Sequence, residues 1–143
     1  MDPLSITAGV VGVVVPALHC VRLLVDDLQK IADAPDAVKA LKDDLVMVDN
    51  ALTSLQSVSD VQWKSLGEGV VSLSKNSTQL CSDSCNKFRT ALAHWTRHST
   101  NGTLSWQDRA TIGLIKQSQI KSMSERLQTC KTTLISVASI ATL

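Results

Sequence analysis

The sequence predicts an all-α fold, an elongated antiparallel four-helix bundle with a mostly apolar N-terminal helix. Of the 143 residues, 44% are apolar and 19% are charged, which suits one domain with one hydrophobic core. Aromatic residues amount to only 3%, so Val, Leu, Ile and Ala must fill the interior, as they do where helices pack on helices. Four long segments also repeat apolar residues at helical spacing, with short turns between them.

The first segment, residues 4–25, is apolar except for small hydroxyl residues, His19 and Arg22. A helix that is apolar on nearly every side is buried all round, or it faces lipid or a partner. A membrane-spanning helix needs about 20 apolar residues. This segment reaches that length only by including Pro16, where we expect a kink or a new helix, together with His19 and Arg22. Three interpretations stay open: a core or partner-facing helix, a conditional membrane segment, and a permanent transmembrane anchor.

The second and fourth helices have regular apolar stripes. Pro35 favours the start of the second helix, because proline suits the first helical turn. Its apolar residues are spaced by three and four: Val38, Leu41, Leu45, Val48, Leu52 and Leu55. Ser105 is expected to open the fourth helix, after a polar loop over residues 97–104. The stripe later in that helix consists of Ile120, Met123, Leu127, Cys130, Leu134, Val137 and Ala141.

The third helix, residues 61–97, has a weaker pattern. Gly67 and Gly69 lower its helical propensity near the start, and Ser77 falls within the apolar stripe. The expected core positions are Leu66, Val70, Leu73, Leu80, Ser84, Phe88, Leu92 and Trp95.

Charge and cysteine content indicate a cytoplasmic protein that does not bind nucleic acid. The net charge is +1, whereas nucleic-acid binders usually show a strong basic excess. Residues 1–60 hold nine acidic and four basic side chains, and residues 61–143 hold four acidic and ten basic ones. Helices from the two halves could attract each other, or the charges could simply be two solvated faces of opposite sign. The four cysteines are widely spread, and no basic residue precedes the first apolar segment as a signal peptide would require.

We find no residue cluster that indicates an enzyme, a cofactor or a metal site. The strongest candidate, Cys81 and Cys85 followed by His94 and His98, contains the ligand types of a zinc site. On one continuous helix, however, the cysteine pair and the histidine pair point to opposite sides. We therefore expect each cysteine to be a buried structural thiol, and we expect no catalytic residue.

Four stretches of the chain resemble a known family. They read MDPLSITAGVVGVV, DAPDAVKALKDDL, SWQDRATIGLI and LQTCKTTLISVASIATL. Together they are similar to the HeLo-like N-terminal domains of fungal STAND receptors, which are NLR-like proteins carrying NACHT or ankyrin-type regions. The resemblance covers residues 1–143 and implies a helical bundle with an effector role in regulated cell death during non-self recognition. It also implies that oligomerisation of a downstream region frees the first helix to enter a membrane, with residues 4–15 at the matching positions.

The functional hypothesis is therefore a cytoplasmic effector domain that moves to the plasma membrane on activation and self-associates there. A regulatory region beyond residue 143, or a partner protein, would supply the trigger. Ala8, Gly9 and Gly12 would allow another helix to approach closely, with Ala8 and Gly12 in small-xxx-small spacing. The expected membrane-facing or partner-facing residues are Leu4, Ile6, Ala8, Gly9, Val10, Val11, Gly12, Val13, Val14 and Val15.

The alternative hypothesis is a non-lytic helical oligomerisation or protein-interaction module that uses the exposed part of the first helix. Small-molecule binding in the bundle interior is a third hypothesis, and no polar cluster in the sequence favours it.

Overall fold

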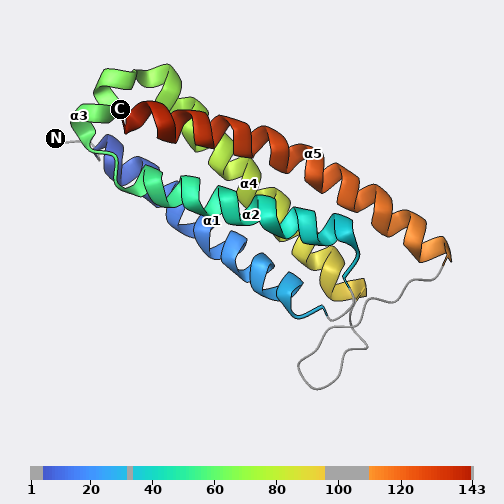
Figure 1. Cartoon of the computed structure of the whole chain (residues 1–143). Helices are drawn as coiled ribbons and strands as arrows, with labels where there is room; N and C mark the ends of the chain where they lie inside the picture. The colour runs from blue at the N-terminus through green and yellow to red at the C-terminus, as the bar shows by residue number, and fades with distance from the viewer. Residues whose placement is uncertain (1–4, 32–33, 96–109, 143) are drawn as a thin grey trace.

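The computed structural model describes residues 5–31, 34–95 and 110–142. Over these ranges the chain forms five α-helices and no strand, which confirms the all-α prediction and the apolar first helix (Figure 1). The helices are α1 (Ile6–Gln29), α2 (Asp36–Gln56), α3 (Asp60–Leu66), α4 (Glu68–Trp95) and α5 (Ala110–Ala141). The predicted loop over residues 97–104 and the predicted start of the fourth helix at Ser105 lie outside the described residues.

The four long helices alternate in direction along the chain, as predicted, and form a ring (Figure 1). In this ring α1 packs on α2 and α4, and α5 packs on the same two helices. The pair α1 and α4 runs parallel, because Cys20 lies beside Asn86 and Asp27 lies beside Arg89. The pair α2 and α5 is parallel too, so the bundle consists of two antiparallel hairpins set side by side. The short α3 connects the hairpins at one end and contacts α1, α4 and α5.

Local chemistry explains where the helices begin and end. Ser59 caps α3 in a reciprocal arrangement with Gln62, in which each side chain bonds the backbone N–H of the other. Gly67 ends α3 at a φ of 95°, a conformation that residues with a side chain rarely adopt. The predicted third helix is therefore two helices, since the chain turns at Gly67. Pro16, by contrast, lies inside α1, which runs as one helix from Ile6 to Gln29.

The predicted core stripes are confirmed for α2 and α5. Every position of both stripes is buried, and in α2 none of the six residues is more than 1% exposed. The core of the bundle thus lies along the axis between these helices and the inward sides of α1 and α4.

The predicted stripe of α4 is wrong at two positions, Leu73 and Leu80, and is confirmed at Ser84, Phe88 and Leu92. Leu73 and Leu80 are 49% and 44% exposed, and the core positions are instead occupied by Ser74, Thr78 and the two cysteines of the helix. Buried hydroxyl groups are tolerated here because each donates a hydrogen bond to a carbonyl one turn earlier. The Ser74 hydroxyl lies 2.8 Å from the Val70 carbonyl oxygen, and the Thr78 hydroxyl lies 2.7 Å from that of Ser74.

In the described part of the chain, two ion pairs join the acidic N-terminal half to the basic C-terminal half. Asp27 pairs with Arg89 and Asp44 pairs with Lys131, each at 2.9 Å. The expected attraction between the halves therefore takes the form of single contacts between neighbouring parallel helices. Partly exposed pairs of this kind contribute about 0–1 kcal/mol each, so they orient the hairpins more than they stabilise them.

Candidate functional site: the outer face of the first helix

Polar contacts fix the N-terminus of α1 to the connection after α2 and to the start of α3. Ser5 is the N-cap, and its hydroxyl accepts a hydrogen bond of 3.0 Å from the backbone N–H of Ala8. The backbone N–H of Thr7 donates to the Asp60 carboxylate at 2.7 Å, and the Thr7 hydroxyl lies 3.4 Å from the Val58 carbonyl oxygen. Hydrogen bonds from Thr7 lower the pKa of Asp60 below its ordinary value. The start of α1 is therefore held by a carboxylate that is ionised at neutral pH.

The inner face of α1 belongs to the core. Seven apolar side chains are buried there: Val10, Val14, Ala17, Leu18, Val21, Leu24 and Leu28. Two of the predicted membrane-facing or partner-facing residues, Val10 and Val14, are among them and are each 1% exposed. In this bundle they meet other helices of the chain, and they would reach a membrane or partner only if α1 left the bundle.

The opposite side of α1 presents a stripe of small and apolar residues to the surface. We call Ala8, Val11, Gly12 and Val15 the outer face of α1. Ala8, Gly12 and Val15 are exposed, with Val15 at 48%, and Val11 is half-buried. Of the other predicted residues, Ile6, Gly9 and Val13 are half-buried, and Leu4 lies outside the described residues.

The two glycines of the predicted close-approach site have different surroundings. A Cβ on Gly9 would lie 3.0 Å from the Nζ atom of Lys75, because that side chain reaches over Gly9 from α4. A Cβ on Gly12 would have no neighbour within 4 Å. No described helix of this chain therefore uses the small surface around Gly12, and it is open to another helix or to lipid.

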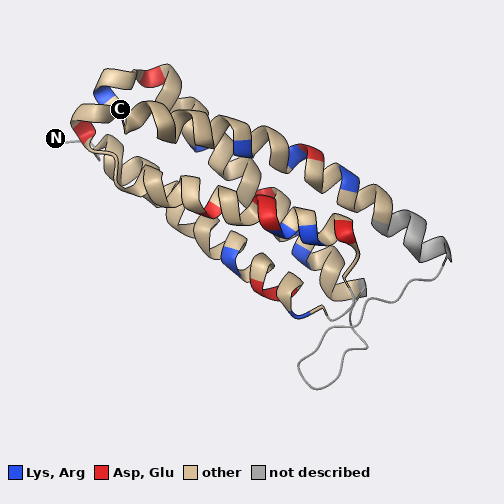
Figure 2. Cartoon of the chain, viewed as in Figure 1, with Lys and Arg blue, Asp and Glu red and all other residues tan. Residues whose placement is uncertain are grey.

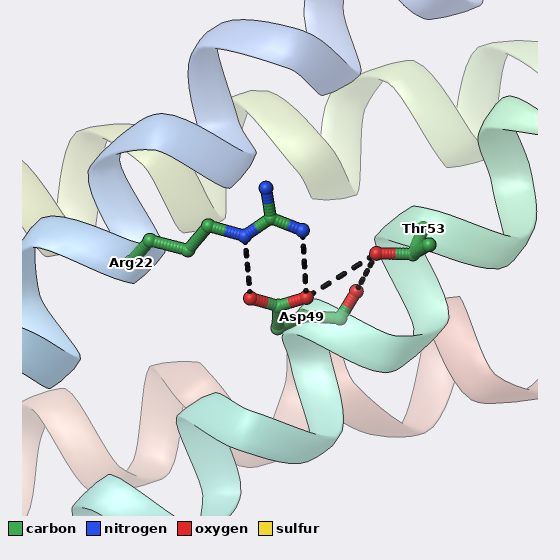
Figure 3. Close-up of polar contacts among 3 residues, drawn as sticks. All are labelled: Arg22, Asp49 and Thr53. Carbon is green, nitrogen blue, oxygen red and sulfur yellow. Dashed lines mark hydrogen bonds and ion pairs between the residues drawn. The ribbon is translucent and has the colours of Figure 1, made fainter.

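Charges on α1 are confined to its C-terminal part. Residues 6–21 contain no Asp, Glu, Lys or Arg, and the corresponding part of the helix has no charged colour in Figure 2. Arg22 then forms a two-pronged contact with Asp49 of α2, with Nε–Oδ2 and Nη2–Oδ1 distances of 2.9 and 3.2 Å (Figure 3). The Thr53 hydroxyl also donates to Asp49, at 3.2 Å from Oδ1. This contact ties the charged part of α1 to α2.

By length and composition α1 could cross a membrane. The most apolar 18-residue window of α1 has a mean hydropathy of 2.0, and a third of this window is buried in the bundle. Core helices of soluble proteins pass the same test, so hydropathy alone does not establish a membrane role. What distinguishes α1 is that no charged residue interrupts its outward side before Arg22.

The cysteines and histidines do not come together as a metal site in the described part of the chain, which contains no group of three potential metal ligands. Cys81 and Cys85 lie in the core, while His94 is exposed. His98 lies outside the described residues. A hydrogen bond with Cys81 and burial raise the pKa of the Cys130 thiol, which keeps it protonated. The three buried cysteines thus occupy core positions, as expected, and Cys20 is half-buried near Asn86.

Sequence reasoning did not find the contacts that hold α1 in place. Arg22 interrupts an apolar run in the sequence, and only the folded chain shows that it pairs with Asp49. The contact between Thr7 and Asp60 joins residues 53 positions apart, so no local pattern could have indicated it.

Comparison with known proteins gave one match. The family model described as "Pigment biosynthesis cluster protein PigL N-terminal" matches residues 1–143. No curated protein and no solved structure matches the chain. The family match supports a fungal helical N-terminal domain, while the resemblance to HeLo-like domains of STAND receptors stays a hypothesis.

Proposed function

The chain belongs to the PigL N-terminal family of fungal pigment-cluster proteins, and from this premise we propose that it is a membrane-targeting effector domain whose membrane-active element is α1. The proposal includes the role that the HeLo-like resemblance implies, namely an effector of regulated cell death in a STAND-type receptor. In this role the domain rests in the cytoplasm and moves to the plasma membrane after its trigger.

The observation that carries the proposal is the apolar outer face of α1. The core needs only the inner face of a surface helix to be apolar, and the outer face is normally polar. On α1 the outer face carries no charge before Arg22, and Val15 is 48% exposed. Moving apolar surface out of water is favourable, by about 25 cal/mol for each Å² buried.

The length of the uncharged segment decides how α1 would meet lipid. Residues 6–21 rise about 24 Å along a helix, less than the roughly 30 Å of a bilayer's hydrocarbon core. Spanning would therefore require the Arg22 side chain to extend to the headgroup region. An orientation along the membrane interface requires no such adjustment.

Energetics indicate that docking precedes release. Freeing α1 would expose its seven buried side chains, at about 1.5–3 kcal/mol for each large one, which amounts to more than 10 kcal/mol. Such a cost exceeds what thermal fluctuation supplies. We therefore propose that the intact bundle first docks through the outer face, and that a trigger in a region beyond residue 143 or in a partner protein is needed for insertion.

The test uses two exposed valines on adjacent helices. Val15→Lys places a charge on the outer face of α1, and Val46→Lys makes the same change at a 43% exposed valine of α2. Vesicles of phosphatidylcholine and phosphatidylserine are sedimented with each variant, and dye release is followed in parallel. We expect the intact chain and Val46→Lys to bind and Val15→Lys not to bind, with unchanged circular dichroism. Equal binding by both variants, or no binding by the intact chain, would contradict the proposal.

A second candidate function is self-association without membrane damage, and the open surface at Gly12 favours it. Ala8 and Gly12 form a small-xxx-small pair on which a second copy of α1 could pack closely. Analytical ultracentrifugation of the same variants separates the two functions. A dimer that Val15→Lys dissociates, in a protein that does not bind vesicles, would support the interaction module.

A further inference from the structure

A groove of about 390 Å³ lies between α4 and α5, away from the outer face of α1. This volume is within the range of small-molecule sites, about 300–1,000 Å³. The groove is lined by residues 84–91 of α4 and 119–126 of α5. The stretch of α4 that lines it runs beside the charged part of α1, since Asn86 contacts Cys20 and Arg89 contacts Asp27. The groove therefore lies level with the charged part of α1 and not with its outer face.

Among the described residues that line the groove, two are cations and none is a carboxylate. Lys87 and Arg126 are both exposed, and neither forms an ion pair with another residue that the structure describes. The nearby cations Arg89 and Lys131, by contrast, are paired with aspartates of the N-terminal hairpin. Two unpaired cations on opposite walls of one groove attract an anion, and an arginine favours a planar group such as a carboxylate.

A serine hydroxyl lines the same groove. Other hydroxyl groups of α4, those of Ser74, Thr78 and Thr90, donate to carbonyl oxygens one turn earlier. Ser84 is 4% exposed and lines the groove. A serine hydroxyl can donate a hydrogen bond, so a ligand oxygen in the groove can accept one from Ser84.

The floor of the groove is apolar. Phe88 and Met123, each 4% exposed, line it from the two helices. An aromatic ring and a thioether form a surface on which a flat apolar ligand packs well. Gln119 and Ser122 add polar groups to the α5 wall.

We propose that this groove binds a small, soluble, amphipathic anion with an aromatic body. The acidic group lies between Lys87 and Arg126 and accepts a hydrogen bond from Ser84, while the aromatic body packs on Phe88 and Met123. The α4–α5 hairpin then carries a ligand site that is separate from the surface proposed for membrane docking.

The test compares two fluorescent probes that differ by one charged group, anilinonaphthalene sulfonate and its uncharged analogue phenylnaphthylamine. The variants are Lys87→Gln with Arg126→Gln, Ser84→Ala, and the control Lys121→Gln, an exposed lysine of α5 outside the groove. We expect the double variant to lose about tenfold in affinity for the sulfonate and Ser84→Ala about threefold, since a typical net hydrogen bond changes affinity by roughly two- to tenfold. Lys121→Gln should bind as the natural chain does, and the uncharged probe should bind the double variant and the natural chain equally.

Three results would overturn the proposal. An unchanged sulfonate affinity in the double variant would show that the cations do not form the site. An equal loss in Lys121→Gln would indicate general charge attraction, and an equal loss for both probes would indicate damage to the groove. Vesicle sedimentation distinguishes a lipid headgroup from a free ligand: the double variant should bind vesicles as the natural chain does, and a loss there would assign the groove to lipid.

Discussion

The helices α1 and α2 bury similar stripes but present different faces to solvent. Each contributes seven buried residues at helical spacing. The outward side of α2 intersperses Lys39, Asp43 and Asn50 with exposed Val46 and Met47, whereas the outer face of α1 consists of Ala8, Val11, Gly12 and Val15. The need to fill the core explains both inner faces, and contact with water explains the polar residues on the outward side of α2. The apolar outer face of α1 is not needed for packing, and for this reason we propose it as the surface that meets lipid or a partner.

Matched truncations test whether the inner faces of α1 and α2 contribute equally to the stability of the bundle. These substitutions have the largest expected effect. Leu24 in α1 and Leu52 in α2 are both 0% exposed. Leu24→Ala and Leu52→Ala should each lower the free energy of unfolding by about 2–5 kcal/mol, because each leaves a cavity in a packed core. Urea denaturation measures both. A loss below 1 kcal/mol for Leu24→Ala alone would mean that α1 is only loosely part of the bundle.

The open surface at Gly12 predicts a gain in stability on substitution. Gly12→Ala should raise the free energy of unfolding by about 0.8–1 kcal/mol, since alanine is the better helix former and nothing lies where its Cβ would be. Gly9→Ala is the matched control and should gain less, because the Lys75 ammonium must move away from the new Cβ. Thermal unfolding followed by circular dichroism gives both values. A loss of stability in Gly12→Ala would show that Gly12 is already in close contact.

How much of the bundle could be predicted from sequence depends on how large the core residues are. The Leu and Val repeats of α2 and α5 predicted their buried faces, because large aliphatic side chains at helical spacing have no favourable position except the core. In α4 the same rule selected Leu73 and Leu80, while small residues such as Ser74 and Thr78 occupy the core. Intrahelical hydrogen bonds allow those hydroxyls to be buried, and the neighbouring helices determine which side of α4 faces inward. The spacing of apolar residues alone therefore could not show which side of α4 is buried.

The candidate site was predictable in location but not in detail. The absence of charge in residues 6–21 indicated a special first helix. Val10 and Val14 nevertheless lie in the core, because the sequence of an all-apolar helix does not show which side packs. The parallel pairing of α1 with α4, which brings Lys75 over Gly9, depends on how the two hairpins stack. No residue pattern within one helix carries that information.

Arg22, the first charged residue of α1, pairs with Asp49 of α2, and substitution of Arg22 measures how much this pair stabilises the bundle. The Arg22 side chain is 59% exposed, so Arg22→Gln should lower the free energy of unfolding only slightly. The loss should shrink at high salt, because exposed charges are screened. Lys30→Gln, which removes a pair within α1, is the control and should cost less than Arg22→Gln. Urea denaturation at low and high salt measures both, and a loss independent of salt would contradict the ionic origin.

The smallest expected effect concerns the contact between Thr7 and Asp60. Because hydrogen bonds from Thr7 lower the pKa of Asp60 in the folded state, the stabilisation is complete above the ordinary pKa of an aspartate, about 3.9. It is lost as the pH falls through the lower folded value. Asp60→Ala should therefore be less stable than the natural chain by a constant amount from pH 8 to about 5, and the difference should vanish in strong acid. Urea denaturation across this range measures it. A difference that changes near pH 6 would require another titrating group.

The most direct test asks which helix meets lipid. In a Cys20→Ser background, an environment-sensitive nitrobenzoxadiazole dye is attached either at Val15→Cys or at Val46→Cys, since the remaining natural cysteines are buried. Anionic vesicles are then added to each labelled protein. We expect a blue shift and a strong gain in emission for the dye on α1, and little change for the dye on α2. Equal responses at both positions, or a response only on α2, would contradict the proposal that the outer face of α1 meets lipid.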